Sequence, residues 1–294
     1  MTRASDLVDQ ILALDPGHRD IAAFSTPGAA DKAARALRAA KRVLIVTGFS
    51  VEPDVPETDG PPGAAVLGRA LRRFGARVRY VTDTANVPLV EAALKTLDEP
   101  SDVIVFPGGT DGARRLLEAE RPTHLVAIER PARNRNGDYL NMRGISVAAW
   151  NPPIDELFLR RDKPRPVTIG IGDGGNEIGM GSALRRIARL DALRARIAAV
   201  VRVDHLVVAG VSNWGGYGVV AALGRLTGRD LLHSPETERR LIEALVAVGA
   251  CDGVTRRREP TVDGLGLETH AGIVDLFRLA ARSRVTRPRP ILNR

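Results

Sequence analysis

The chain reads Val-Thr-Ile-Gly-Ile-Gly-Asp-Gly-Gly-Asn-Glu-Ile-Gly-Met-Gly from Val167 to Gly181. A short β-branched run leads into a segment so rich in glycine that its backbone must approach another group closely or adopt positive φ. The segment also carries the carboxylates of Asp173 and Glu177 and the amide of Asn176. This combination predicts a buried strand that ends in a functional loop, although a turn whose Asp and Asn side chains cap the next helix has the same composition.

Gly170, Gly172 and Gly175 in this stretch match the G-x-G-x-x-G pattern of dinucleotide-binding loops. Two features argue against that interpretation. The carboxylates of the loop would face a negatively charged pyrophosphate, and residues 203–209, the next strand-like run, end without an acidic partner for a ribose. Carboxylates on a tight glycine frame suit a cation, an ammonium group or proton transfer better. A nucleotide-binding enzyme that uses the Gly170 to Gly175 loop is therefore kept as an alternative.

Apolar runs of strand length alternate with helical patterns along the chain. The runs cover residues 43–46, 78–81, 103–106, 125–128, 167–171 and 206–209, and the helical patterns cover 6–14, 31–40, 63–74, 88–97, 110–120 and 215–226. This alternation predicts an α/β fold, a mostly parallel sheet with helices on both faces in a Rossmann-like layering. We expect a single α/β domain over residues 1–294, in which residues 282–294 form a flexible basic tail.

Right-handed crossovers place the carboxyl ends of all these strands at one edge of the sheet, where open α/β sheets bind ligands. Several polar residues follow the strands directly and are expected to meet there: Asp83, Glu129, Asp173, Glu177 and Asn213. The loop that contains Glu57 and Asp59 begins at the same edge, which favours a lid over the site, although Asp59 could also cap the helix that follows.

Two further loops carry candidate binding residues. Arg143, flanked by Asn141 and Gly144, suits bidentate capture of a substrate carboxylate. Ser212 and Asn213 lead from a strand into a helix, where free backbone N–H groups can bind an anion or where these residues serve only as caps. The chain contains no G-x-S-x-G motif, Walker loop or Cys–His pair, and this disfavours acyl transfer and P-loop phosphate chemistry.

Composition limits the class of partner. The formal net charge is +8, but the basic residues are almost all arginines spread over helix-like segments, and aromatic residues make up only 4%, so no nucleic-acid partner is expected. No run reaches the length of a membrane span, so no membrane partner is expected either. The single cysteine, Cys251, and the absence of a secretion signal lead us to expect a cytoplasmic protein.

Motifs distributed along nearly the whole chain resemble the D-glutamate cyclase C-terminal-like family. They are Glu57-Thr58-Asp59-Gly60-Pro61-Pro62-Gly63, Thr82-Asp83, Glu129-Arg130, Tyr139, Asn141-Met142-Arg143-Gly144, the glycine-rich stretch from Gly170 to Gly181, and Ser212-Asn213-Trp214-Gly215. The resemblance implies an amino-acid substrate and a hydro-lyase that interconverts D-glutamate with 5-oxo-D-proline and water.

The resemblance also implies roles for residues of this chain. Candidate catalytic residues are Asp173, Glu177, Asn176, Asp83 and Glu129. Candidate substrate-binding residues are Arg143, Asn141, Arg130, Tyr139, Gly172, Gly174, Gly175, Ser212, Asn213, Trp214, Glu57 and Asp59. Lactam formation requires a base, an acid and an anion clamp, so Asp173 or Glu177 is expected to act as the base, and Arg143 and Arg130 to hold the α-carboxylate. Alternatively Asp173, Glu177 and Asp83 hold a divalent cation, Mg²⁺ or Mn²⁺, with Glu129 beside them.

A member of that family also carries an N-terminal hydro-lyase-like domain, and this suggests a different class of function. The chain would then be a non-catalytic ligand-binding or partner domain for a separate hydro-lyase. A homo-oligomer is a further expectation.

Overall fold

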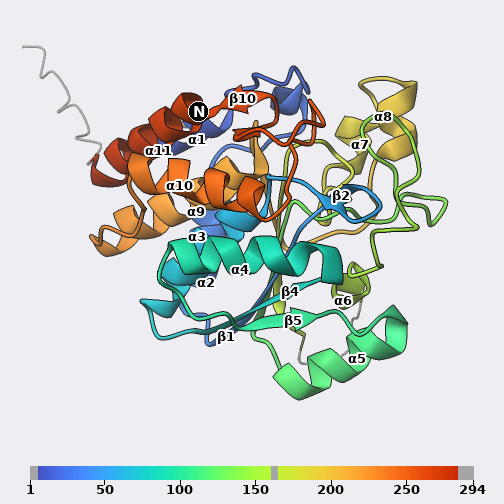
Figure 1. Ribbon diagram of the computed structural model, residues 1–294, viewed down its shortest axis with the longest axis horizontal. Helices are drawn as coiled ribbons and strands as arrows, with labels where there is room; N and C mark the ends of the chain where they lie inside the picture. The colour runs from blue at the N-terminus through green and yellow to red at the C-terminus, as the bar shows by residue number, and fades with distance from the viewer. Residues whose placement is uncertain (1–5, 160–164, 284–294) are drawn as a thin grey trace, which may run out of the picture.

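A six-stranded, all-parallel sheet forms the centre of the protein (Figure 1). The structure is a computed structural model that describes residues 6–159 and 165–283; residues 284–294 of the expected basic tail lie outside the described part. The strands follow the order β5-β4-β1-β6-β7-β8 and comprise β1 (Arg42–Thr47), β4 (Arg77–Thr82), β5 (Val103–Val105), β6 (His124–Ile128), β7 (Val167–Gly172) and β8 (His205–Val208). The predicted α/β class is thereby confirmed.

The strand order places a change of direction between β1 and β6. The chain moves outward from β1 through β4 to β5, returns to β6 beside β1, and then continues outward through β7 to β8. Loops after β1 and β6 therefore leave the sheet in opposite directions, and a crevice opens between them at the carboxyl ends of the strands. This crevice is the place where the fold can bind a ligand.

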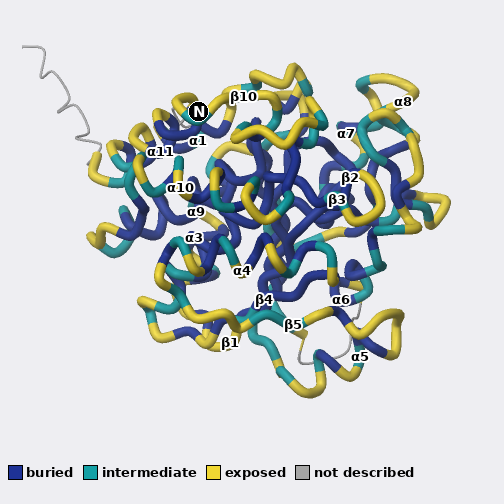
Figure 2. Tube along the Cα trace, viewed as in Figure 1, coloured by how far each residue is buried: buried dark blue, intermediate teal, exposed yellow. Residues whose placement is uncertain are grey.

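Side chains alternate along each strand between two apolar layers. In β1, Val43 and Ile45 belong to one layer, and Leu44 and Val46 to the other. The first layer is covered by α2 (Ala29–Leu37), α3 (Pro61–Arg72), α4 (Val87–Thr96) and α9 (Ser212–Thr227), over which α1 (Leu7–Leu12), α10 (Pro235–Ala247) and α11 (Leu267–Arg282) pack. The second is covered by α5 (Gly109–Glu120), α6 (Glu156–Leu159) and the segment that contains α7 (Leu184–Ile187). Figure 2 shows the buried sheet between these more exposed layers.

The glycines of β7 let the chain fold back onto the sheet. A Cβ atom on Gly170 would lie 2.5 Å from the carbonyl oxygen of Ile178, and one on Gly172 would lie 2.8 Å from Cε of Met180. The backbone after the loop can therefore pack directly against the strand only because these side chains are missing. The loop does not lead at once into a helix, since the next helix, α7, begins at Leu184.

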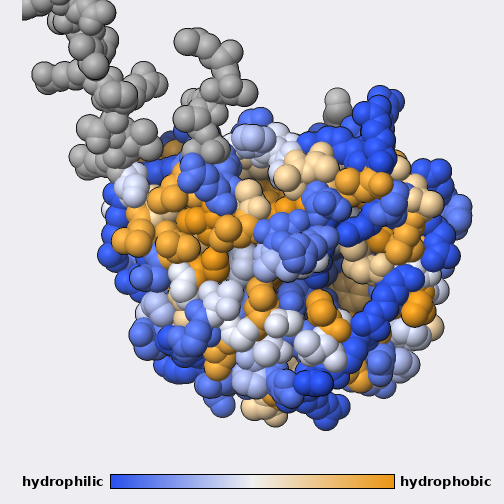
Figure 3. Space-filling model, turned by 90° about the horizontal axis from the view of Figure 1, so that it is seen from above, coloured by the Kyte–Doolittle hydropathy of each residue, from blue (hydrophilic) through white to orange (hydrophobic). Residues whose placement is uncertain are grey.

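Smaller elements complete the ligand-binding edge. They are two hairpins, β2 (Ser50–Glu52) with β3 (Val55–Pro56) and β9 (Thr261–Val262) with β10 (Leu265–Gly266), the helix α8 (Ala192–Ile197), and two short 3-10 helices at Ile21–Ala23 and Thr84–Asn86. Seen from the side of β10 and α8, the surface is mostly hydrophilic, and hydrophobic side chains gather over α11, where Leu276 and Leu279 are exposed (Figure 3). Among the described residues, no helix combines the length and hydropathy that crossing a bilayer requires.

Candidate functional site

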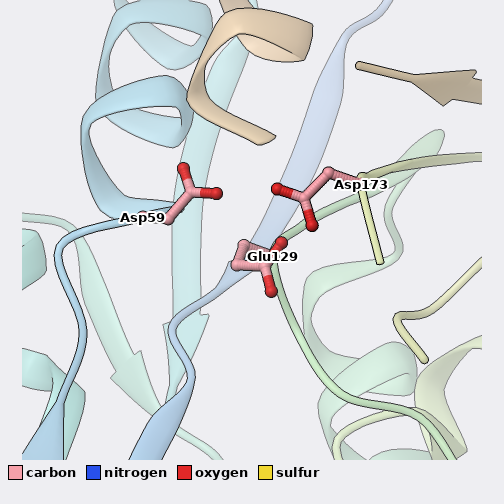
Figure 4. A group of neighbouring side chains, drawn as sticks. All are labelled: Asp59, Glu129 and Asp173. Carbon is pink, nitrogen blue, oxygen red and sulfur yellow. The ribbon is translucent and has the colours of Figure 1, made fainter. Parts of the chain in front are cut away.

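Three buried carboxyl groups meet at the carboxyl edge of the sheet. Asp59 precedes α3, Glu129 follows β6, and Asp173 follows β7. Each offers one oxygen atom, and these atoms lie within 4.8 Å of one another. Figure 4 shows the three side chains turned toward a common space. We call Asp59, Glu129 and Asp173 the acidic triad. It lies beside the crevice between β1 and β6, as the strand order leads one to expect.

Backbone N–H groups of α9 fix Asp59. Its Oδ1 accepts the N–H of Asn213 at 2.8 Å and its Oδ2 accepts the N–H of Ser212 at 2.9 Å. In return, Oδ1 of Asn213 accepts the N–H groups of Gly60 at 3.0 Å and Gly63 at 2.8 Å, at the start of α3. Asp59 therefore caps α9 rather than the helix that follows it, and Asn213 caps α3. The side chain of Ser212 caps neither helix, because its hydroxyl donates to Glu129.

Glu129 occupies an unusual backbone conformation. Its φ angle is 43°, in the left-handed region that residues other than glycine rarely adopt. The side chain is buried, and its Oε2 accepts the hydroxyl of Ser212 at 2.5 Å. Backbone strain of this kind concentrates at functional sites, where the surrounding structure holds it in place. In this protein, the left-handed conformation directs Glu129, the first residue after β6, into the crevice.

Arg19 provides the positive charge nearest to the acidic triad, and sequence reasoning missed it. Its Nη1 lies 2.9 Å from Oδ2 of Asp173 and 2.8 Å from Oδ2 of Asp263, and it donates to the carbonyl of Gly210 at 3.2 Å. Nothing around Arg19 in the sequence signals this role. Asp263 did carry a signal, because Asp-Gly between apolar residues marks a hairpin turn, and Asp263 and Gly264 connect β9 to β10.

Burial is the main cause of the pKa shifts of the carboxyl groups at this site. It raises the pKa of Asp59 to about 7, with the negative charge of Asp263 adding to the effect. Burial also raises the pKa of Glu57 well above the usual range, and the negative charge of Asp263 adds to the effect. Burial raises the pKa of Glu129 in the same way, with the negative charge of Glu177 as the second cause. The pKa of Asp173 is likewise raised by burial, but the Arg19 guanidinium opposes that increase. The site therefore holds several carboxyl groups that favour a proton or a cation.

A cavity of about 500 Å³ opens onto these groups. Its acidic side is formed by Glu57, Glu129, Asp173, Glu177 and Asp263, with Arg19 among them, and its other polar residues include Arg143, Arg194, Arg256, Asn141 and Asn176. A cavity with separate negative and positive regions suits a small zwitterionic ligand, since an ammonium group and a carboxylate each find opposite charge. Residues of three predicted loops line this cavity: Glu57, Asn141 with Arg143, and Asp173 with Asn176 and Glu177, whereas Ser212 and Asn213 do not.

Glu177 fills the position at which the glycine loop would otherwise hold an anion. Its carboxylate accepts the N–H groups of Gly174 at 2.7 Å and Gly175 at 2.8 Å. In a dinucleotide-binding loop these donors face the pyrophosphate at the start of a helix. The geometry therefore favours a structural role for the loop glycines and gives no support to the nucleotide alternative.

Several predicted site residues lie away from the cavity. The guanidinium of Arg130 is buried, forms an ion pair with Asp83 and donates to the carbonyl groups of Gly48 and Pro152. Asp83 follows β4, on the far side of β1 from β6, and lines a different cavity. The structure therefore brings neither residue into the acidic triad, and the oxygen ligands within reach of one cation come from Asp59, Glu129 and Asp173 rather than from Asp173, Glu177 and Asp83.

Tyr139 and Trp214 also support neighbouring segments. The hydroxyl of Tyr139 donates to Asp155 at 2.5 Å, and Nε1 of Trp214 donates to Nδ1 of His270 at 3.0 Å. His270 in turn contacts the carbonyl of Val262 at 3.2 Å, in the hairpin that carries Asp263. These side chains position the loops around the cavity and do not line it.

Comparison with known proteins gives a match over most of the chain. A family model described as D-glutamate cyclase-like, C-terminal, matches residues 8–278. Human mitochondrial D-glutamate cyclase is 36% identical over an alignment of 234 residues, which covers 74% of this chain and 38% of that protein. The solved structures that match include an exopolyphosphatase-related protein from Bacteroides fragilis, with a TM-score of 0.43 and 10% identity over 87% of this chain and 57% of that one. RecJ from Thermus thermophilus in complex with Mn²⁺ has a TM-score of 0.37 and 14% identity over 83% of this chain and 26% of that one.

Proposed function

Because this chain belongs to the D-glutamate cyclase-like, C-terminal family, we propose that it interconverts D-glutamate with 5-oxo-D-proline and water. The observation that carries the proposal is the partly buried ion pair between Arg19 and Asp173 beside Glu129, at the acidic side of a cavity of about 500 Å³. The chain covers less than half of the human enzyme, so the assignment of that enzyme's activity to this segment is itself part of the proposal.

Lactam formation moves two protons. The nitrogen of D-glutamate, an ammonium group at the start, loses two protons and bonds to Cδ, the carbon of the γ-carboxyl group, while one oxygen of that carboxyl group gains two protons and leaves as water. Asp173 is the base in this proposal: burial raises its pKa, which makes the carboxylate a stronger base, and the ion pair with Arg19 offsets part of that increase. Glu129 is the acid, because burial raises its pKa and keeps a proton available for the leaving oxygen. General acid and base groups of this kind contribute about 10²- to 10⁴-fold each.

Arg19 would also stabilise the charge that develops on the γ-carboxyl oxygen. Only its Nη1 is engaged by Asp173, Asp263 and Gly210; Nε and Nη2 make no hydrogen bond within residues 6–159 and 165–283. Its three contacts hold the guanidinium in place before the substrate binds. A preorganised donor next to the developing negative charge lowers the barrier without having to reorient.

Alternatively, a divalent cation fits the same site, and Glu129 and Asp173 are then its ligands rather than the acid and the base. Carboxylate oxygens are the ligands that Mg²⁺ and Mn²⁺ prefer, and in the acidic triad Oε1 of Glu129 and Oδ1 of Asp173 accept no hydrogen bond from a described residue. Asp59, Glu129 and Asp173 would hold the ion. When bound it would supply Lewis-acid polarisation of the γ-carboxyl group.

A non-catalytic ligand-binding or partner domain remains the second candidate, since the chain matches only part of the human enzyme and a separate hydro-lyase would then perform the reaction. We retain the single-domain organisation, the cytoplasmic location and a homo-oligomer as predictions.

The test of the proposed function is proton NMR of the purified chain with D-glutamate and, separately, with 5-oxo-D-proline. Each reaction is run with added Mg²⁺ or Mn²⁺ and with a chelator, and the L-enantiomers serve as controls. Interconversion of the D-compounds is the expected result. Binding of both compounds without interconversion would favour the partner-domain function instead.

A further inference from the structure

Three arginines from separate segments border the cavity away from the acidic triad. Arg143 belongs to the loop after β6, Arg194 to α8, and Arg256 to the loop that follows α10. Nη2 of Arg143 contacts the carbonyl of Val254 at 3.4 Å, and Nη1 of Arg194 donates to the carbonyl of Gly174 at 2.9 Å. The first contact links the loop of Arg143 with the loop of Arg256, and the second links α8 with the glycine-rich loop after β7. We call Arg143, Arg194 and Arg256 the arginine mouth.

The charge of the arginine mouth is largely uncompensated. In the part of the chain that the structure describes, Arg143 and Arg194 form no ion pair, and Arg256 has only Glu52, at 3.7 Å and largely exposed to solvent. Nε and Nη1 of Arg256 are buried without any hydrogen-bond partner. Buried donors left unpaired are costly, so an anion that approaches this guanidinium gains more than one that approaches a hydrated surface arginine.

The loop under Arg256 is built to hold it there. Arg256 has a φ angle of 62°, a conformation unfavourable for arginine, and its N–H donates to the carbonyl of Asp252 at 2.9 Å. The buried carboxylate of Asp252 accepts the N–H groups of Val254 and Thr255, both at 2.8 Å, and of Gly264 at 2.7 Å. The loop is therefore fixed by its own hydrogen bonds, and the side chain of Arg256 does not contribute to them.

We propose that Arg194 and Arg256, together with Arg143, form the subsite that binds the α-carboxylate of the substrate. This inference rests on the proposed function, and it replaces Arg130, which is buried against Asp83, as the second arginine of the clamp. The acidic side of the cavity then receives the amine and the γ-carboxyl group, which react. D-Glutamate and 5-oxo-D-proline share the α-carboxylate, so one subsite serves both directions of the reaction.

The α-carboxylate takes no part in bond making, so its contacts contribute equally to ground state and transition state. Loss of such a contact raises KM and leaves kcat nearly unchanged. Loss of Arg19 or Asp173 would lower kcat instead. This difference separates the arginine mouth from the acidic side of the cavity in kinetic experiments.

The decisive experiment compares the binding of 5-oxo-D-proline with that of 2-pyrrolidinone, the same lactam without a carboxylate, by NMR titration. We expect the wild-type chain to prefer 5-oxo-D-proline strongly. Arg256→Gln and Arg194→Gln should each weaken its binding roughly tenfold or more, as expected for the loss of a charge-assisted contact, with 2-pyrrolidinone unaffected. Arg257→Gln is the matched control, because Arg257 is adjacent in the same loop, 71% exposed, and outside the cavity.

Each result bears on the proposal independently of turnover. A wild-type chain that binds both lactams equally, or neither, would overturn the subsite, and so would variants that bind 5-oxo-D-proline as tightly as the Arg257→Gln control. If the binding pattern appears as expected but no interconversion of the D-compounds is detected, the subsite stands and only the proposed activity fails.

Discussion

Asp59 and Asn213 cap each other's helices: the carboxylate of Asp59 accepts the N–H of Asn213 at 2.8 Å, while Oδ1 of Asn213 accepts the N–H of Gly63 at the same distance. The amino ends of α3 and α9 therefore converge beside the acidic triad. The partial positive charges at these two helix ends stabilise negative charge at the acidic triad, where burial otherwise disfavours ionisation. The mutual capping thus links the stability of the fold directly to the geometry of the site.

Replacing Asn213 with alanine should destabilise the protein by about 1–3 kcal/mol, because the substitution leaves buried N–H groups of Gly60 and Gly63 without an acceptor. The measurement is urea unfolding, in which the midpoint should fall and the slope stay constant. Ser234→Ala is the control, since Ser234 caps α10 away from the cavity. Ser234→Ala should lower the free energy of unfolding by about 1 kcal/mol and leave the activity unchanged. Asn213→Ala should lower both the free energy of unfolding and the activity. Equal activities of the two variants would argue against the link between cap and site.

Replacing Asp173 with asparagine should lower turnover at least about 100-fold, because the variant lacks the proposed base. The fold should persist, since Asp263 and Gly210 still hold Arg19. Turnover is followed by NMR and the fold by thermal unfolding. Wild-type turnover in a folded Asp173→Asn protein would remove this residue from the mechanism.

The sequence predicted the sheet because each buried strand is a continuous apolar run, and β1, β4, β6 and β7 lie within one or two residues of their predicted limits. It also predicted that Glu129 and Asp173 would meet, since both directly follow parallel strands. Strand order was beyond its reach. Without that order Asp83 could not be separated from Glu129, although β1 lies between the strands they follow.

Residues that reach the site from irregular segments gave no periodic signal. Arg19 and Arg256 come from loops far apart in the chain, and only the folded structure brings them to one cavity. The glycines of β7 show the opposite problem: they match a dinucleotide pattern, but Gly170 and Gly172 are required for close packing of the returning chain.

Replacing Glu57 with glutamine should stabilise the metal-free protein increasingly as the pH rises. Burial raises the pKa of Glu57 above its ordinary value of 4.5, so the folded chain holds the proton more tightly than the unfolded chain. Its contribution to stability is complete below that value and is lost as the pH rises toward the folded pKa. The variant avoids this loss. Thermal unfolding with a chelator, from roughly pH 4 to pH 8, should show a widening gap.

Glu52→Gln is the control for that experiment, because Glu52 lies in the same region with a side chain that is 62% exposed. Its stability should follow that of the wild type at every pH. A constant difference between Glu57→Gln and the wild type over the whole range would show that Glu57 titrates normally.

Mg²⁺ or Mn²⁺ should raise the Tm of the wild-type chain, and a chelator should reverse the effect. A ligand that binds only the folded state stabilises it by about 2.7 kcal/mol at one hundred times its Kd. The shift should be larger at higher pH, since protons compete for the carboxylates of the acidic triad. Glu129→Gln should show no metal-induced rise in Tm. A shift of equal size in Glu129→Gln would place the ion elsewhere.

Replacing Arg130 with glutamine should destabilise the fold by about 3–5 kcal/mol and leave the KM of the folded protein unchanged. The substitution leaves the carboxylate of Asp83 buried without its partner, which is the costly way to break a buried ion pair. Arg143→Gln should do the opposite: Arg143 is exposed, so its loss should change stability by less than about 0.5 kcal/mol while KM rises. Urea unfolding and steady-state kinetics of both variants measure the contrast. A normal urea midpoint with a raised KM in Arg130→Gln would return that residue to the substrate clamp.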